Sequence, residues 1–395
     1  MEKIHIVITG RRNTGKSSLI NSILGQNKAI VTDVAGTTTD PVKKSFEIPG
    51  IAPVIFIDTA GIDDEGALGQ LRIQKTLEAV RQADAAILVI ADNRFGTYEE
   101  KLIEIFRQQE QPFLLVFNKS DETKPDVRLQ KELSEKYRTE ILDYSTRFPE
   151  RERLIQALSE WIGKPVERSL LEGLVSPGQM VLLVTPIDSE APTGRLILPQ
   201  VQILRALLDH RCISIVLQPE EIPAFFAYPG RKPDLIITDS QAFARVAPCV
   251  PQDIPLTSFS IVMAHYKGYF EKYLEGTKQI SRLSNGDRIL MLESCSHHVS
   301  CEDIGRVKIP GLLKKFTGKQ LEFDFVAGLD HIERPFKDYA LIIQCGGCMV
   351  TSRQLRNRLK PALEAQIPVS NYGMVLAYIQ GIFERVTEII KKGNE

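Results

Sequence analysis

The sequence lacks an excess of charge of either sign. Its 49 Lys and Arg residues are matched by 50 Asp and Glu residues, which leaves a formal net charge of -1. A protein that attracts nucleic acid through its overall field carries surplus positive charge, so we expect no nucleic-acid partner. Hydrophobic residues make up 43% of the chain and charged residues 25%, as in an ordinary globular protein.

Long apolar runs are also missing. No segment has the roughly 20 apolar residues that cross a membrane, and the opening MEKIHIVITG contains no long apolar signal core. We therefore expect a cytoplasmic protein without a membrane partner. In a reducing compartment the six cysteines are not expected to form disulfides. Cys212 and Cys249 stand alone in apolar contexts, and we expect both to be small core residues.

The chain is too long for one compact core, and its patterning indicates three domains, at 1–165, 178–266 and 267–395. In the first, the apolar stretches HIVITG, PVIFIDTAG, AAILVIAD and FLLVFNKSD alternate with helical patterns, which is typical of an open, mostly parallel sheet. The second and third are smaller α/β patterns. Strands are predicted there at 180–187, 212–218, 234–239, 256–266, 287–294, 322–328 and 339–344.

A phosphate-binding loop is indicated by GRRNTGKS, which lies between a predicted strand and a predicted helix. Gly10 and Gly15 allow the backbone to wrap a phosphate with its N–H groups pointing inward. Lys16 would bind the β- and γ-phosphates, and Ser17 would ligate Mg²⁺. The other residues of this loop expected to contact nucleotide are Asn13, Thr14 and Ser18.

Two further motifs follow apolar strands. DTAG places the carboxylate of Asp58 where it can hold the Mg²⁺ shell, and it places the flexible Gly61 beside the γ-phosphate. In NKSD, Asn118 begins the motif and Asp121 can accept two N–H groups that guanine presents and adenine does not. The apolar part of Lys119 can lie along the purine. The three motifs together predict a GTP-binding α/β domain of the P-loop class, followed by two smaller α/β domains.

In this combination the first domain resembles the translation-factor-related GTPases, especially the branch of the tRNA-modification GTPase MnmE and the Era-like proteins. The resemblance covers 1–163. It implies that GTTTD is switch I, with Thr38 as a Mg²⁺ ligand and Thr37 as a near alternative. It also implies that Ser145 contacts guanine O6 and that Asn13 helps to bind K⁺.

Hydrolysis of GTP to GDP and phosphate is the predicted reaction, with Lys16, Thr38, Asp58 and Gly61 as its catalytic groups. Ile62 stands where many small GTPases carry a glutamine that positions water. Because an aliphatic side chain cannot orient water, we expect slow hydrolysis that K⁺ or dimerisation accelerates.

The remaining four cysteines fall in two segments of the last third, SCSHHVSC and QCGGC, each after an apolar strand. The glycines between Cys345 and Cys348 permit tight turn angles and leave N–H groups free to donate to sulfur. Three interpretations stay open on spacing alone. They are a zinc site on Cys295, His297, Cys345 and Cys348, an iron–sulfur cluster on three thiolates, and unligated thiols.

The whole chain resembles the HydF family of GTPases, which mature iron-iron hydrogenase. PIDSEAPTGRLILPQVQ, DIGRVKIP, QCGGCM and NYGMVLAYI carry this resemblance outside the GTPase motifs. It implies a 4Fe-4S cluster on Cys295, Cys345 and Cys348 and a homodimer formed through 178–266. It further implies a scaffold that receives a transient two-iron precursor from radical-SAM maturation enzymes and passes it to apo iron-iron hydrogenase. Radical-SAM chemistry in this chain itself is disfavoured, because CxxxCxxC is absent.

The sequence departs from that family just before its CxxC. The family pattern has a histidine there, and this chain has Gln344, whose amide is a poor iron ligand. The fourth ligand is therefore open, with candidates His297, His298, Cys301, Asp188, Glu190 and water.

An alternative hypothesis, from another functional class, is a tRNA-modification-type GTPase with a zinc-stabilised C-terminal domain. Against it, the chain has no clear basic patch and its final KKGNE carries no catalytic cysteine motif.

Overall fold

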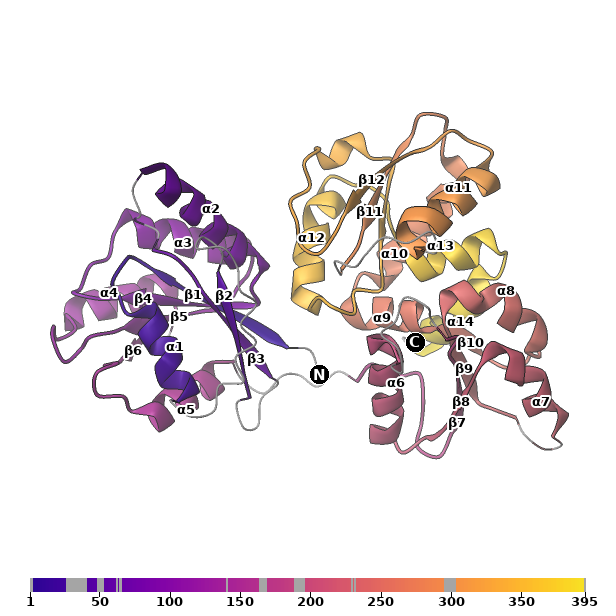
Figure 1. The fold of residues 1–395 in the computed structure, drawn as a ribbon, viewed down its shortest axis with the longest axis horizontal. Coiled ribbons are helices and arrows are strands. Elements are labelled where there is room, and N and C mark those ends of the chain that lie inside the picture. Colours follow the sequence, from indigo (N-terminus) through magenta and orange to yellow (C-terminus); the bar gives the residue numbers. More distant parts are fainter. Residues whose placement is uncertain are drawn as a thin grey trace. The chain divides into compact units, whose positions relative to one another are not determined.

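The computed structural model describes residues 3–25, 41–47, 53–61, 63, 66–139, 141–162, 169–187, 196–228, 230, 232–294 and 303–393. The chain divides into two compact units, Met1–Glu167 and Arg168–Glu395 (Figure 1). Within the described ranges, no helix is both long enough and apolar enough to cross a membrane.

The first unit is built around a six-stranded sheet with the order β2-β3-β1-β4-β5-β6. All neighbouring strands are parallel except β2, which runs antiparallel to β3. The strands are β1 (Ile4–Gly10), β2 (Val42–Phe46), β3 (Val54–Asp58), β4 (Ala85–Ile90), β5 (Phe113–Phe117) and β6 (Ile141–Asp143). The helices are α1 (Lys16–Leu24), α2 (Gly66–Gln82), α3 (Thr97–Gln108), α4 (Val127–Tyr137) and α5 (Arg151–Ile162).

Helices cover both faces of this sheet, as its near-continuous apolar strands require. Along β1, Ile6 and Ile8 face the core shared with α1 and α5, while Val7 faces the core shared with α2, α3 and α4. Figure 1 shows α1 and α5 together on one side of the strands. This layering brings the carboxyl ends of β1, β3 and β5 to one edge, where loops can hold a ligand.

The second unit contains two four-stranded parallel sheets, with the orders β10-β9-β7-β8 and β12-β11-β13-β14. Their strands are β7 (Met180–Val184), β8 (Ile213–Leu217), β9 (Leu235–Thr238), β10 (Leu256–Ser258), β11 (Arg288–Leu292), β12 (Glu322–Val326), β13 (Leu341–Gln344) and β14 (Val369–Asn371). The helices are α6 (Leu198–Asp209), α7 (Ile222–Ala227), α8 (Phe243–Val246), α9 (Phe259–Lys267), α10 (Phe270–Thr277), α11 (Ile309–Thr317), α12 (Ser352–Glu364), α13 (Tyr372–Ile379) and α14 (Phe383–Gly393).

One apolar core joins the two sheets of this unit. It runs from Leu171 through the first sheet to Ile390 in α14. The guanidinium of Arg385 in α14 also donates to the carbonyls of Val250 (3.0 Å) and Pro251 (2.8 Å), beside β10. The expected boundary near 266 therefore lies inside a compact unit, and its division into two domains stays a prediction.

The predicted α/β class is confirmed, with differences in individual elements. The segment 256–266, predicted as one strand, is a strand only to Ser258 and then becomes α9. Ser258 starts this helix because its hydroxyl accepts a hydrogen bond from the Ile261 N–H (3.3 Å). The helix α11 is preceded by a π-helical turn, Ile304–Lys308. The strands β2, β6 and β14 were not predicted, and the latter two are only three residues long.

Candidate nucleotide and thiol sites

The loop between β1 and α1 has the backbone that its glycines predict. Gly10 has φ 145° and Gly15 has φ 88°, and both angles lie where other residues are strained. A Cβ on Gly10 would lie 2.3 Å from the Val89 carbonyl oxygen, and one on Gly15 would lie 2.2 Å from Asn118 Nδ2. Each glycine is therefore required both by backbone angle and by space.

Lys16 folds back over this loop. Its Nζ donates to the carbonyl oxygens of Gly10 (3.2 Å) and Arg11 (2.7 Å), and the residue is 7% exposed. The Thr14 hydroxyl donates to the same Arg11 carbonyl (3.0 Å) and narrows the turn. A buried ammonium group at the first residue of α1 stands where helix N–H groups also favour an anion. Ser17 and Ser18 follow it, exposed in the first turn of α1.

The NKSD segment after β5 contacts the phosphate loop directly. The Asn118 amide donates to the Thr14 carbonyl (2.8 Å) and accepts from the Thr146 N–H (3.3 Å). The Ser145 hydroxyl donates to Asp121 Oδ1 (2.6 Å), which fixes the carboxylate expected to read guanine. The structure thus brings Asn118, Asp121 and Ser145 together, although the short strand before Ser145 was not predicted. Lys119 adopts φ 60° at the turn that separates Asn118 from Asp121.

Asp58 ends β3 at the same edge of the sheet. Its Oδ1 is buried and has no hydrogen-bond partner within the described ranges. A buried carboxylate oxygen without a donor is costly, and a hard cation or its water shell would satisfy it. Gly61 lies against the loop, where an added Cβ would meet the Arg12 N–H nitrogen at 2.7 Å. The carboxylate of Asp58 therefore fits a Mg²⁺ site. Thr37, Thr38 and Ile62, which were also predicted to lie at this site, are outside the described residues.

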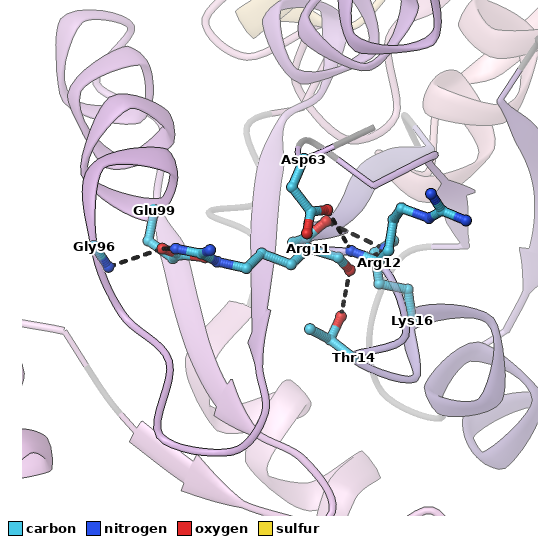
Figure 2. A network of polar contacts seen from close by, with 8 residues as sticks. Arg11, Arg12, Thr14, Lys16, Asp63, Gly96 and Glu99 are labelled. Carbon is cyan, nitrogen blue, oxygen red and sulfur yellow. Dashed lines mark hydrogen bonds and ion pairs between the residues drawn. The ribbon is translucent and has the colours of Figure 1, made fainter. Parts of the chain in front are cut away.

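Two acidic residues that the sequence did not single out fix the arginines of this loop (Figure 2). Arg11 forms a two-pronged ion pair with the buried Glu99 at the start of α3 (2.8 and 2.9 Å), and Glu99 also accepts from the Gly96 N–H. The hydrogen bond to Glu99 raises the pKa of the Arg11 guanidinium. The backbone N–H of Arg12 donates to Asp63 Oδ1 (2.6 Å). The acidic first turn of α3 was the only sequence signal for Glu99.

A cavity of about 520 Å³ opens beside these groups. Its lining mixes the cations of the phosphate loop with polar residues that follow β4 and β5, as a site for a charged, polar ligand requires. The lining residues are Arg11, Arg12, Asn13, Thr14, Asp63, Ala91, Asp92, Arg94 and Lys119.

The thiol site lies at the carboxyl ends of two neighbouring parallel strands, β11 and β13. Their register pairs Leu292 with Gln344, and the Cys345 N–H donates to the Leu292 carbonyl (2.9 Å). Cys345 Sγ lies 3.0 Å from the hydroxyl oxygen of Ser294, a residue 51 positions away in sequence. Ser294 is the residue before Cys295. Strand pairing thus brings the QCGGC turn to the position where the cysteine–histidine segment begins.

Cys345 Sγ accepts two N–H hydrogen bonds, from Gln344 Nε2 (3.4 Å) and from the Gly347 backbone (3.5 Å). Gly347 has φ 72°, the left-handed angle that the two-glycine spacing predicts. Burial, followed by the nearby Cys345 thiol, raises the pKa of Cys348 to about 11. A metal-free Cys348 therefore stays protonated at neutral pH, and metal binding there releases a proton.

Two cations lie near this turn, the half-buried Arg358 and the buried Lys267, and no sequence motif predicted either of them. The Arg358 guanidinium donates to the carbonyls of Glu293 (2.8 Å), just after β11, and Val326 (3.0 Å), the last residue of β12. Lys267 is 1% exposed and donates to the Val350 carbonyl. Burial raises the pKa of Cys348 by more than the charge of Lys267 lowers it.

A metal would need more ligands than the described thiols provide. Cys295, His297, His298 and Cys301 lie outside the described residues, as do Asp188 and Glu190. Within the described ranges, no three His, Cys, Asp or Glu residues are arranged to hold a metal ion. The donors around Cys345 nevertheless suit a metal-bound thiolate, because N–H groups at such distances stabilise sulfur that carries charge.

The two isolated cysteines differ from each other. Cys212 is buried, as predicted. Cys249 is exposed, so the prediction that it is a core residue was wrong. It ends a short 3₁₀ turn, Ala247–Cys249, that carries its side chain to the surface in spite of its apolar neighbours.

Family models account for most of the chain. Residues 5–119 match a model described as 50S ribosome-binding GTPase. Residues 170–268 match the hydrogen maturase F dimerization domain, and residues 271–389 match the hydrogen maturase F tetramerization domain. Together these last two models match more than half of the chain. The chain belongs to the hydrogen maturase F family. The predicted resemblance to HydF is thus confirmed, and the first unit is a GTPase domain.

The MnmE relatives match only this GTPase domain. The tRNA modification GTPase MnmE of Nitrosomonas europaea is 42% identical over 135 residues, which are 34% of this chain and 30% of that protein. The MnmE of Endomicrobium trichonymphae is 44% identical over 123 residues, 30% of this chain and 27% of that protein. The chain therefore spans less than a third of these relatives, and none of these matches reaches the hydrogen maturase F domains.

Solved structures of GTPases are also similar to this chain. The G domain of the T. maritima FeoB iron transporter is 22% identical, with a TM-score of 0.33, over 41% of this chain and 100% of that one. Era from Aquifex aeolicus is 21% identical, with a TM-score of 0.35, over 55% of this chain and 93% of that one. Similarity at this level carries no argument about mechanism.

Proposed function

We propose that this chain is a GTP-hydrolysing scaffold that holds a 4Fe-4S cluster and delivers a two-iron precursor to apo iron-iron hydrogenase. Residues 1–165 bind and hydrolyse GTP, 178–266 form the dimer, and 267–395 carry the cluster on Cys295, Cys345 and Cys348. Radical-SAM maturation enzymes supply the precursor, and the protein works in the cytoplasm without nucleic acid or membrane. Membership of the hydrogen maturase F family supports this cargo and these partners.

The observation that carries the cluster assignment is the contact between Cys345 Sγ and Ser294 Oγ (3.0 Å). Ser294 is joined by a peptide bond to Cys295, and neighbouring Cα atoms lie about 3.8 Å apart. The contact therefore places the residue that precedes Cys295 beside Cys345, at one edge of one sheet. Three thiolates from such segments are the ligands that iron–sulfur clusters use.

The nucleotide chemistry follows from the edge of the first sheet. Lys16 holds the β- and γ-phosphates, while the loop N–H groups from Asn13 onward surround them. Asp121, oriented by Ser145, accepts the two guanine N–H groups. Mg²⁺, held through Ser17, Thr38 and the Asp58 carboxylate, supplies positive charge at the phosphates.

K⁺ beside Asn13 adds further positive charge where other GTPases use an arginine. Asn13 lines the cavity, and its backbone adopts the left-handed angle φ 60° within the loop. Because Ile62 cannot orient water, hydrolysis is slow and K⁺ accelerates it. Such an enzyme acts as a switch, and its nucleotide state gates the exchange of partners.

A homodimer is supported by the edge of the first sheet in the second unit. The strand β8 is a terminal strand in that sheet and exposes Ile213 (53%) and Val216 (42%). The adjacent α6 exposes Val201 and Leu208. An unpaired edge strand with apolar side chains invites pairing with another chain. The family description of residues 170–268 as a dimerization domain points the same way.

Anaerobic purification tests the cluster directly. We expect about four iron and four sulfide ions per chain, as the formula of a 4Fe-4S cluster requires. After reduction, the protein should give the electron paramagnetic resonance signal of a 4Fe-4S cluster. Cys345→Ser should abolish that signal and leave GTP hydrolysis within about twofold of wild type, because the nucleotide site uses none of its atoms. Cys249→Ser is the matched control, since its thiol is exposed and outside both sites.

Zinc in place of iron would overturn this proposal. Such a result would favour the tRNA-modification-type GTPase, whose basis is the 42% identity to MnmE within the GTPase domain. Loss of GTP hydrolysis together with iron in Cys345→Ser would contradict the separation of the two sites.

A further inference from the structure

Gln344 occupies an unusual place for a polar side chain. It is the last residue of β13, it is 1% exposed, and it stands between the ends of β13 and β11. Its Nε2 donates to Ser294 Oγ (3.1 Å) and to Cys345 Sγ (3.4 Å). Buried amides are retained where their hydrogen bonds are used. Here both partners belong to the thiol site.

The backbone holds this amide in position. Gln344 is in register with Leu292, and its carbonyl oxygen accepts from the Asn371 amide (3.4 Å) on β14. The backbone of Gln344 is therefore paired with β11 on one side and with β14 on the other. It has little freedom to move away from the sulfur.

Metal binding would select one orientation of the Gln344 amide. As a thiol, Cys345 can donate to the Ser294 hydroxyl oxygen, at 3.0 Å. As a metal-bound thiolate, it can only accept. Nε2 must then face the sulfur, and the Ser294 hydroxyl must turn its hydrogen toward the sulfur as well. With the Gly347 N–H at 3.5 Å, three donors then surround one thiolate.

The amide oxygen is not placed as a ligand would be. Gln344 Oε1 is buried and has no hydrogen-bond partner in the described part of the chain. The same amide directs its nitrogen, not its oxygen, toward the sulfur. A neutral, hard oxygen is also a weak donor to iron that thiolates already hold.

We propose that Gln344 is a positioning residue for the cluster, which donates a hydrogen bond to the sulfur of Cys345 and does not ligate iron. This inference rests on the proposed 4Fe-4S cluster. A hydrogen bond to a ligand sulfur withdraws electron density from the cluster and stabilises its more negative, reduced state. Gln344 thereby raises the reduction potential of the cluster. It also leaves the fourth iron position to another ligand.

Gln344→Met separates these roles, because methionine has nearly the same length and no N–H donor. The full-length protein is purified anaerobically, iron and sulfide are measured, and the reduction potential is determined by titration followed with electron paramagnetic resonance. We expect wild-type iron content and a reduction potential below that of wild type. Gln320→Met, on an exposed loop before β12, makes the same change away from the cysteines and should alter neither quantity.

A second variant covers the case in which Gln344→Met fails to fold. Ser294→Ala removes another donor to the same sulfur and a partner of the same amide. It should also lower the potential at unchanged iron content. Circular dichroism and GTP hydrolysis establish that each variant is folded. A merely structural role for these side chains would change stability without shifting the potential.

Three results would overturn the inference. Loss of one iron per cluster in folded Gln344→Met would make Gln344 a ligand. A reduction potential in Gln344→Met equal to that of wild type would show that the hydrogen bond does not tune the cluster. If Gln344→Met does not fold, the same result in Ser294→Ala would show this. A wild-type protein without iron would refute the proposed cluster itself, and this inference with it.

Discussion

The nucleotide site and the thiol site use the same edge of a parallel sheet in different ways. Both lie where neighbouring parallel strands end, after β1, β3 and β5 in the GTPase domain and after β11 and β13 in the second unit. The phosphate loop is one contiguous segment whose backbone N–H groups face the ligand. The thiol site instead joins side chains from segments 51 residues apart.

The difference lies in what each ligand needs. A phosphate is bound by backbone N–H groups, so the loop conformation is the site, and glycines set it locally. A metal cluster is bound by side chains, so strand pairing must first bring the ligands together. A local change should therefore damage the nucleotide site more than the thiol site.

The largest expected effect comes from Gly15→Ala. It combines backbone strain of about 1–2 kcal/mol with loss of the Asn118–Thr14 hydrogen bond, worth about 1 kcal/mol. GTP affinity, measured with a fluorescent nucleotide, should fall on the order of 100-fold. Gly347→Ala has a similar strain but meets only the movable Leu355 side chain at 2.7 Å. It should retain its iron, so equal damage from both variants would contradict the comparison.

Gly346→Ala is the matched control for this pair. Gly346 is not among the residues with positive φ, and an added Cβ would lie 3.6 Å from Ser260 Oγ, an ordinary contact. Iron content and GTP affinity should both equal those of wild type.

Asp121→Asn should change the nucleotide that is bound. A charged hydrogen-bond pair contributes about 1.5–3 kcal/mol, so GTP affinity should fall roughly 10- to 100-fold. Xanthosine triphosphate, which offers the matching acceptor, should become the preferred ligand in competition binding. Unchanged selectivity for GTP would refute the base-reading role of Asp121. Ser145→Ala should give a smaller loss, since it only orients the carboxylate.

Removal of iron should affect the thiol site alone. A ligand that binds only the folded state stabilises it by mass action. Treatment with a chelator should lower the unfolding midpoint of the second unit by roughly 5–10 °C in calorimetry. The unfolding midpoint of the GTPase domain, which bound GTP raises, should not change. In Cys345→Ser the chelator should leave the unfolding midpoint of the second unit unchanged. A shift of this midpoint in that variant would show that the chelator acts at another site.

The smallest effect concerns the two cysteines outside both sites. Burial, followed by the charge of Asp234, raises the pKa of Cys212. A raised thiol pKa means less thiolate at a given pH, so alkylation of Cys212 at pH 8.5 should be slower than that of the exposed Cys249. The expected ratio of rates is on the order of tenfold, and it should narrow as the pH rises. Peptide mapping by mass spectrometry measures both rates in one sample.

Elements with strong local patterns were predicted well. The strands β1, β3, β4 and β5 lie where their apolar stretches placed them. The helix α9 was predicted as part of a strand, because a buried helix and a buried strand are both apolar throughout. Only the cap at Ser258 and packing on all sides decide between them.

The sequence by itself determined the GTPase class and the phosphate loop. Gly10 and Gly15 specify a backbone that few other residues can adopt, so eight residues carry the information. Tertiary structure alone decided the pairing of Arg11 with Glu99, the meeting of Ser294 with Cys345 and the burial of Gln344. These contacts depend on which strands and helices become neighbours. That choice is made by burial of the whole core, and no short segment encodes it.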